Sequence, residues 1–279
     1  MCRFIAYRGT PSFLDELVCA PRRSLLHQSL HAEQAKVPTQ GDGVGIGWYG
    51  ERETPGRYRE AMPAWSDENL LSLCRSVRSP LFFAHVRAAT GTPTSRANCH
   101  PFSHGPWLFM HNGQVAGYPR LRRGLEALLP DALYGARGGS TDSELLFLLI
   151  LAQIEQGAPV LQATAQVLHT VALRMREAGA LGPLRFTAAL SDGKTLYAFR
   201  TANDRRPPSL YLRPHWAAGA DAAEGAPGMV IASEPLDETA DWQAVPDGHV
   251  VVVDEAGTRV APLPSWQLPE TAALVASAA

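Results

Sequence analysis

The sequence has no long hydrophobic run, no strong excess of one charge and few cysteines. Its longest apolar run, LLFLLILA at residues 145–152, is far shorter than the roughly 20 residues that a membrane-spanning helix needs. The net charge of −2 gives no basic surface for nucleic acid. The four cysteines include no C-x-x-C pair, and the first residues are too charged for a signal peptide. We therefore expect a cytoplasmic protein that binds neither membrane nor nucleic acid and has no disulfide framework.

Short apolar runs bounded by turn residues predict strands at residues 4–7, 44–49, 81–86, 107–111, 185–190, 195–200, 229–232 and 250–253. Helical periodicity is clearest in STDSELLFLLILAQIEQG and PVLQATAQVLHTVALRMREAG, and shorter helices are expected at residues 69–77 and 121–129. Strands, two consecutive helices and then strands again indicate an α+β protein with helices packed on antiparallel sheets. We expect one domain over residues 2–265, a long loop over residues 203–228 and a poorly anchored tail over residues 266–279.

The chain opens MCRFIAYRGT, with a cysteine directly behind the first methionine and an apolar run directly behind the cysteine. Chain termini usually fray, so a strand this close to the start is unusual. Cys2 has two interpretations. It is either a small buried thiol beside a strand, since free cysteine is among the most buried residue types, or a nucleophile that carries a thiol and, after removal of Met1, a free α-amine.

Polar residues follow the strand LFFAH in the segment HVRAATGTPTSRANCHPF. Arg87 lies at the end of that strand and is either a surface arginine in a weak ion pair or an anchor for a substrate carboxylate, which guanidinium binds in bidentate fashion. The histidines of this region could also be metal ligands. Their spacing matches no compact zinc pattern, so we expect no metal site at His85, His100, His104 and His111.

Two further motifs have both a structural and a functional interpretation. Asn112-Gly113 follows a predicted strand, and Asn-Gly is the strongest short hairpin signal; the same pair could supply two donors to an oxyanion hole. Thr141 and Glu144 form a capping box at the start of the first long helix, with Asp142 in its first turn. Asp142 therefore either serves the helix start alone or presents a carboxylate to an ammonium group.

Taken together, these stretches resemble the class II glutamine amidotransferases, which are N-terminal-nucleophile hydrolases. The motifs that carry the resemblance are Met-Cys at the start, Asp42-Gly43, HVRAAT, NCHPF, MHNG and TDSE, which occur in the family's order over roughly the first 150 residues. The chain is most similar to the stand-alone branch that includes the amidase subunit of the fungal glutathione-degradation complex and the γ-glutamyl hydrolase of ergothioneine synthesis. The resemblance implies a four-layer αββα sandwich.

The resemblance also implies a site and an activity. Cys2 would be the nucleophile, Asn112 and Gly113 the oxyanion donors, Arg87 and Asp142 the ligands of the glutamyl α-carboxylate and α-ammonium, with Thr90 and His100 lining the same pocket. The activity would be hydrolysis of a γ-glutamyl amide, in glutamine or a small γ-glutamyl compound, through a Cys2 thioester and without cofactor or metal. The α-amine has a pKa close to that of the thiol and could serve as the base.

Alternatives remain open on the sequence alone. The chain could be a glutaminase subunit that supplies ammonia to a separate synthase, or a catalytically silent assembly subunit, and a protein partner or a homo-oligomer fits either interpretation. The leaving amine is not identified by these motifs. We expect it to meet the loop over residues 203–228 and the segment ASEPLD, where Ser233 and Glu234 follow a strand.

Overall fold

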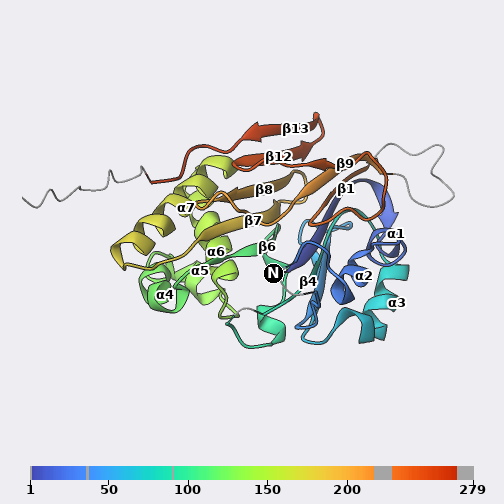
Figure 1. Ribbon diagram of the computed structural model, residues 1–279, viewed down its shortest axis with the longest axis horizontal. Helices are drawn as coiled ribbons and strands as arrows, with labels where there is room; N and C mark the ends of the chain where they lie inside the picture. Colours follow the sequence, from blue (N-terminus) through green and yellow to red (C-terminus); the bar gives the residue numbers. More distant parts are fainter. Residues whose placement is uncertain (1, 36–37, 90, 217–227, 269–279) are drawn as a thin grey trace, which may run out of the picture.

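Two antiparallel sheets lie face to face, with helices on both outer faces (Figure 1). The computed structural model describes residues 2–35, 38–89, 91–216 and 228–268. The seven-stranded sheet has the order β11-β9-β10-β1-β4-β2-β3. Its strands are β1 (Arg3–Phe13), β2 (Val44–Trp48), β3 (Gly56–Glu60), β4 (Arg78–Val86), β9 (Tyr211–Trp216), β10 (Gly228–Ala232) and β11 (Gln243–Ala244).

The six-stranded sheet has the order β13-β12-β8-β7-β6-β5. Its strands are β5 (Phe102–His104), β6 (Trp107–Val115), β7 (Leu184–Ser191), β8 (Leu196–Ala202), β12 (His249–Asp254) and β13 (Gly257–Pro262). Short helices cover the first sheet: α1 (Asp15–Val18), α2 (Leu25–Leu30), α3 (Glu68–Ser76) and the 3₁₀ turn η1 (Ala64–Ser66). The second sheet is covered by α4 (Tyr118–Glu126), α5 (Asp131–Gly135), α6 (Asp142–Glu155) and α7 (Val160–Glu177), and a second 3₁₀ turn, η2 (Arg96–Asn98), precedes β5.

The residues of β1 explain why the protein has four layers. Successive side chains of a strand point to opposite faces of its sheet. Phe4 and Ala6 join the apolar core between the two sheets, whereas Ile5 and Tyr7 pack under the helices of the outer face. Because β1 is buried on both faces, its sequence is a continuous apolar run rather than an alternating one. The expected αββα sandwich is confirmed.

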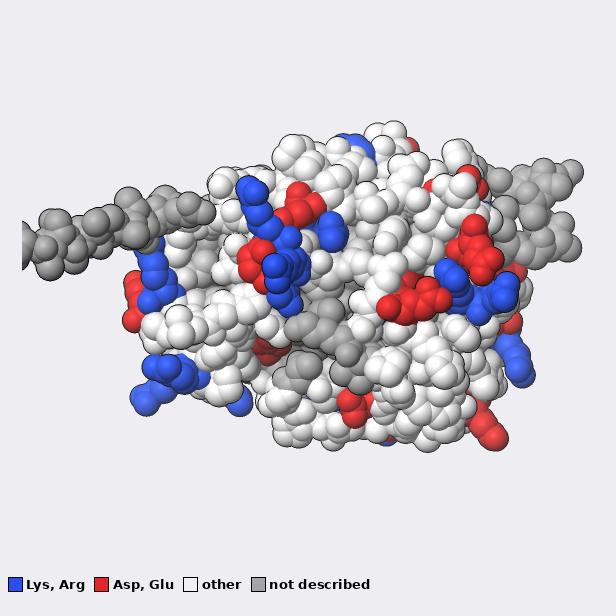
Figure 2. All heavy atoms as spheres, in the orientation of Figure 1, with Lys and Arg blue, Asp and Glu red and all other residues white. Residues whose placement is uncertain are grey.

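The run LLFLLILA lies in α6, which is buried on almost every side between the second sheet and α7. Helices that are apolar all round belong in the interior of a protein or in a membrane. Across the described part of the chain, no helix is both long enough and apolar enough to span a bilayer. On the face drawn in Figure 2, basic and acidic side chains lie beside one another with wide uncharged areas between them.

Two sequence-based expectations are wrong. Asn112 and Gly113 form no hairpin turn: they lie inside β6, paired with Thr187 and Phe186 of β7. A tight turn needs a return strand directly after it, but the strand that pairs with Asn112 and Gly113 is β7, which comes much later in the chain. Residues 203–228 include β9, and residues 217–227 lie outside the described ones. Trp266 is buried, and its Nε1 donates to Thr201 Oγ1 at 3.0 Å, so packing on the core extends past residue 265.

Candidate active site

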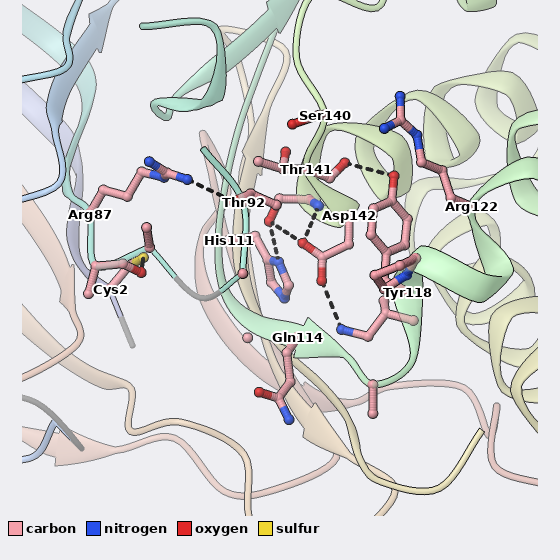
Figure 3. A pocket seen from close by; sticks show the side chains of 18 of the residues that line it. Cys2, Arg87, Thr92, His111, Gln114, Tyr118, Arg122, Ser140, Thr141 and Asp142 are labelled. Atoms are coloured by element: carbon pink, nitrogen blue, oxygen red, sulfur yellow. Dashed lines mark hydrogen bonds between the residues drawn. The ribbon is translucent and has the colours of Figure 1, made fainter. Parts of the chain in front are cut away.

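A cavity of about 480 Å³ lies where the start of β1, the end of β4 and β6 approach the first turn of α6 (Figure 3). The structure brings most of the predicted site residues to this cavity, namely Cys2, Arg87, His100, Gly113 and Asp142. Asn112 is not part of the cavity lining and sits in β6 between two residues that are. Thr90 lies outside the described residues.

Cys2 immediately precedes β1 and is the one of the four cysteines, all of them described, that lines the cavity. It is half-buried, and its Sγ lies 3.7 Å from the Ala88 carbonyl oxygen. Burial raises the pKa of the Cys2 thiol, while the nearby positive charges of Arg87 and Arg3 lower it. Cys99, by contrast, is fully buried outside the cavity and donates to backbone carbonyls, although burial raises the pKa of both thiols. The arrangement favours Cys2 as the reactive thiol.

Arg87 leaves the end of β4 and is 3% exposed, so its interpretation as a surface arginine is wrong. Its Nη2 donates to Thr92 Oγ1 at 2.7 Å and to Pro93 O at 3.3 Å, and its Nη1 donates to Asp42 O at 3.3 Å. Within the described residues these bonds all go to neutral oxygens and none goes to a carboxylate. A buried guanidinium without an anionic partner is costly unless a ligand supplies the charge.

Asp142 faces Arg87 and Cys2 from the other side of the cavity (Figure 3). Its Oδ2 accepts from Val115 N and its Oδ1 from Ser143 N, both at 2.8 Å. Among the described residues, the carboxylate accepts from these neutral backbone N–H groups and lies in no ion pair. The fixed carboxylate therefore has no cationic partner and can receive an ammonium group.

The helix start beside Asp142 forms only half of the expected capping box. Thr141 Oγ1 accepts from Glu144 N at 3.1 Å, as a cap should. The Glu144 carboxylate does not return to Thr141 N, because it accepts from Gly138 N at 3.0 Å and from Gly139 N at 2.7 Å. Glu144 thus holds the loop that leads into the helix and fixes the position of Asp142.

His111 and Ser143 support Asp142 from behind, and the sequence analysis gave neither residue this part. His111 Nε2 lies 3.1 Å from Arg185 O, and a carbonyl can only accept, so Nε2 carries the ring proton. Nδ1 then accepts from Ser143 Oγ at 2.9 Å. Burial lowers the pKa of His111, which agrees with a neutral ring. The sequence did carry a signal for both residues, because His111 belongs to the motif MHNG and Ser143 to the motif TDSE.

Asn112 and Gly113 occupy opposite faces of β6, as adjacent strand residues do. Asn112 is 0% exposed, yet within the described part of the chain its Nδ2 and Oδ1 have no hydrogen-bond partner. Gly113 cannot carry a side chain, because a Cβ there would lie 2.0 Å from Arg185 O and 2.3 Å from His111 Nε2. A buried amide without a partner is rare and points to a ligand that is missing from its surroundings.

His100 lines the cavity and is 4% exposed, with its ring centroid 4.1 Å from that of His85. Burial lowers the pKa of both rings, to about 3 for His85. Two neutral imidazoles can therefore lie in contact without repulsion. Within the ranges that the structure describes, no three His, Cys, Asp or Glu side chains are placed to hold a metal ion.

Ser233 and Glu234, where a leaving amine was expected, are not among the residues that line the cavity. Ser233 Oγ accepts from Phe4 N at 3.0 Å, and Glu234 lies against Arg3, with Oε1 2.6 Å from Nε. Both residues follow β10, which pairs with β1, so the sheet directs them to the start of the chain. These residues therefore anchor the segment around Cys2.

Comparisons with known proteins show which family the chain is similar to. The model of the family "Glutamine amidotransferases class-II" matches residues 21–218. The chain is 33% identical to the γ-glutamyl-hercynylcysteine sulfoxide hydrolase of Mycolicibacterium smegmatis, over 94% of this chain and 100% of that one. It is 28% identical to the probable glutamine amidotransferase DUG3 of Saccharomyces cerevisiae, over 94% of this chain and 84% of that one.

A solved structure is also similar across nearly the whole fold. The glutamine aminotransferase class-II domain protein from Silicibacter pomeroyi superposes with a TM-score of 0.71 at 32% identity, covering 94% of this chain and 99% of that one. The matches in sequence and in fold extend over the strands that carry the cavity. The chain belongs to the class II glutamine amidotransferases.

Proposed function

We propose that this protein hydrolyses the γ-glutamyl amide bond of glutamine or a small γ-glutamyl compound, with Cys2 as the nucleophile. One observation carries the proposal: the Cys2 thiol shares a cavity with a buried cation, Arg87, and a fixed anion, Asp142, neither of which has an oppositely charged partner among the described residues. An amino acid's α-carbon bears a carboxylate and an ammonium. Arg87 binds the first and Asp142 the second, which leaves the γ-amide facing the thiol.

The reaction follows from these positions in two steps. Removal of Met1 leaves a free α-amine on Cys2, which takes the thiol proton directly or through one water. The sulfur attacks the amide carbon, the C–N bond breaks, and the departing amine takes the proton as the thioester forms. Water then attacks the thioester carbon, its proton returns to the sulfur, and glutamate leaves.

Asn112 and Gly113 supply the donors that such a reaction needs at the developing oxyanion. The Asn112 amide is buried and lacks a partner within the described residues, so it is available without breaking an existing bond. Preorganised donors of this kind are worth about 10²–10³ in kcat each. The names of the relatives support the reaction class, since one is a hydrolase of a γ-glutamyl compound and another a probable glutamine amidotransferase.

Two other functions fit the family. A glutaminase subunit would release ammonia from glutamine for a separate synthase, using the same residues. A silent assembly subunit would have no use for a thiol facing unpaired charges, because unpaired buried charges destabilise a fold. The intact site favours an enzyme.

The test is to incubate the protein with glutamine and with a panel of γ-glutamyl compounds, and to measure the released glutamate by mass spectrometry. Wild-type protein should release glutamate, and intact-mass measurement should show that Met1 is absent. Cys2→Ala should be inactive, while Cys19→Ala, which removes a partly exposed thiol outside the cavity, should be as active as wild type. A γ-glutamyl diazoketone should label Cys2 alone. Activity in Cys2→Ala, or in protein that fully retains Met1, would refute the mechanism, and turnover of glutamine alone would favour the glutaminase.

A further inference from the structure

Arg3, the residue after the proposed nucleophile, is a fully buried charge. Its side chain is 0% exposed, and arginine is almost never fully buried unless it is paired. Its Nε lies 2.6 Å from Glu234 Oε1, and its Nη1 donates to the carbonyl oxygen of Cys2 at 3.0 Å. One guanidinium therefore joins the backbone of Cys2 to a carboxylate from the far end of the sequence.

Glu234 is itself held by a third segment. Its Oε2 accepts from Glu33 N at 3.0 Å and its Oε1 from Gln34 N at 2.9 Å. The carboxylate is 4% exposed and has contacts to both of its oxygens. Because these three segments are brought together only in the folded protein, the position of Arg3 is fixed by tertiary structure and not by local geometry.

Cys2 lies outside the paired part of the sheet, so another interaction has to hold it in place. The pairing of β1 with β4 begins at Arg3, opposite Val86, and the pairing with β10 begins at Ile5, opposite Ala232. The ladder hydrogen bonds therefore do not include Cys2. The bond from Arg3 Nη1 to the Cys2 carbonyl restrains that last peptide group, and with it the direction of the thiol.

We propose that the Arg3–Glu234 pair is a positioning device that holds Cys2 toward the cavity, an inference that rests on the proposed role of Cys2. A buried ion pair is usually no more stabilising than a well-packed apolar pair of similar size. A contribution to stability therefore explains the Arg3–Glu234 pair poorly, whereas a role in placing the Cys2 sulfur explains it well. A displacement of about 1 Å at a reacting group can slow a reaction by about 100-fold.

The decisive variant removes both charges at once. Arg3→Met leaves Glu234 buried without a partner and is expected to fold poorly, but Arg3→Met with Glu234→Leu replaces the pair by apolar residues of similar volume. The N–H groups of Glu33 and Gln34 belong to exposed residues and can bond to water instead. The double variant should melt near the wild-type temperature. Its kcat should fall by about 100-fold with KM nearly unchanged, because Arg87 and Asp142 are intact.

Two further variants complete the test. Arg213→Met with Asp237→Leu removes another ion pair of the first sheet, which includes β9, and should leave kcat unchanged. Arg3→Lys keeps the positive charge but loses the guanidinium N–H that donates to the Cys2 carbonyl. This variant should fold, and its kcat should fall, even if the double variant does not fold. Wild-type kcat in either the Arg3–Glu234 double variant or Arg3→Lys would overturn the positioning role while Cys2→Ala is inactive. Absence of turnover in wild-type protein would instead refute the proposed function itself.

Discussion

Replacing Asn112 with alanine should slow turnover without destabilising the protein. Asn112 is fully buried, and among the described residues neither polar atom of its side chain has a hydrogen-bond partner. Burying such a group costs about 1–3 kcal/mol, and removing it relieves that cost while leaving a small cavity that costs a similar amount. The free energy of unfolding should therefore stay within about 1 kcal/mol of wild type. In contrast, kcat should fall by about 10²–10³-fold, with KM nearly unchanged.

Asn98 is a matched control, because it is a similarly buried asparagine whose amide is fully bonded. Its Nδ2 donates to Pro93 O at 2.9 Å and to Ser140 Oγ at 3.2 Å, and its Oδ1 accepts from Ser140 N at 2.8 Å. At about 1 kcal/mol for each bond, Asn98→Ala should lose about 3 kcal/mol of stability. For a chain of this size the melting temperature should fall by roughly 5–10 °C.

Thermal melts and steady-state kinetics on both variants separate a catalytic amide from a structural one. The two variants should differ: Asn112→Ala should keep the wild-type Tm and lose kcat, whereas Asn98→Ala should have a lower Tm. An Asn112→Ala protein that melts as early as Asn98→Ala and retains near-wild-type kcat would show that Asn112 supports the fold, and the oxyanion assignment would be refuted.

The remaining predictions concern Asp142, Gly113 and the pH dependence of stability. Asp142→Asn should lower kcat/KM by about 10- to 100-fold for every γ-glutamyl substrate, since a charged hydrogen bond is worth about 1.5–3 kcal/mol; near-normal kcat/KM would limit Asp142 to the helix start. Gly113→Ala should lose about 2–4 kcal/mol in denaturant unfolding, because its Cβ would displace Arg185 O and break the bond from His111; unchanged stability would contradict that contact. Burial lowers the pKa of His85, His100 and His111, so the unfolded chain takes up protons below about pH 6.5 that the folded protein excludes. The free energy of unfolding should be highest above that pH and should decline toward pH 4 by up to about 1.4 kcal/mol per pH unit for each ring. His85→Phe should make this decline less steep. An unchanged pH dependence in that variant would show that His85 does not cause the decline.

Much of the fold was predictable from local patterns. The strands were placed by short apolar runs, and α7 by a helical periodicity that tertiary packing did not override. Arg87 and Asp142 could be identified because each lies at the boundary of an element, one after β4 and the other at the start of α6. Residues at element ends face the cavities that the elements enclose, which is why separate motifs converged.

The remaining features depend on contacts between distant segments. Asn-Gly signals a turn only if the chain reverses there, and β6 continues because its partner β7 comes from beyond α7. The pairing of Arg3 with Glu234 joins residues at opposite ends of the sequence and has no periodicity to reveal it. A single sequence contains no signal for such pairs, whereas the folded structure shows them directly.

The two sheets, more than the loops, determine the spacing between the Cys2 thiol and the proposed oxyanion donors. Cys2 leads into β1 of one sheet, and Asn112 lies in β6 of the other. The sheets meet through a core that includes Phe4 and Met110, each two residues from one of these groups. Protein cores are packed to nearly crystalline density, and sites built on strands are held more precisely than sites on loops. Arg87 directly follows the last residue of β4, so the proposed ligand of the α-carboxylate is held by a strand in the same way.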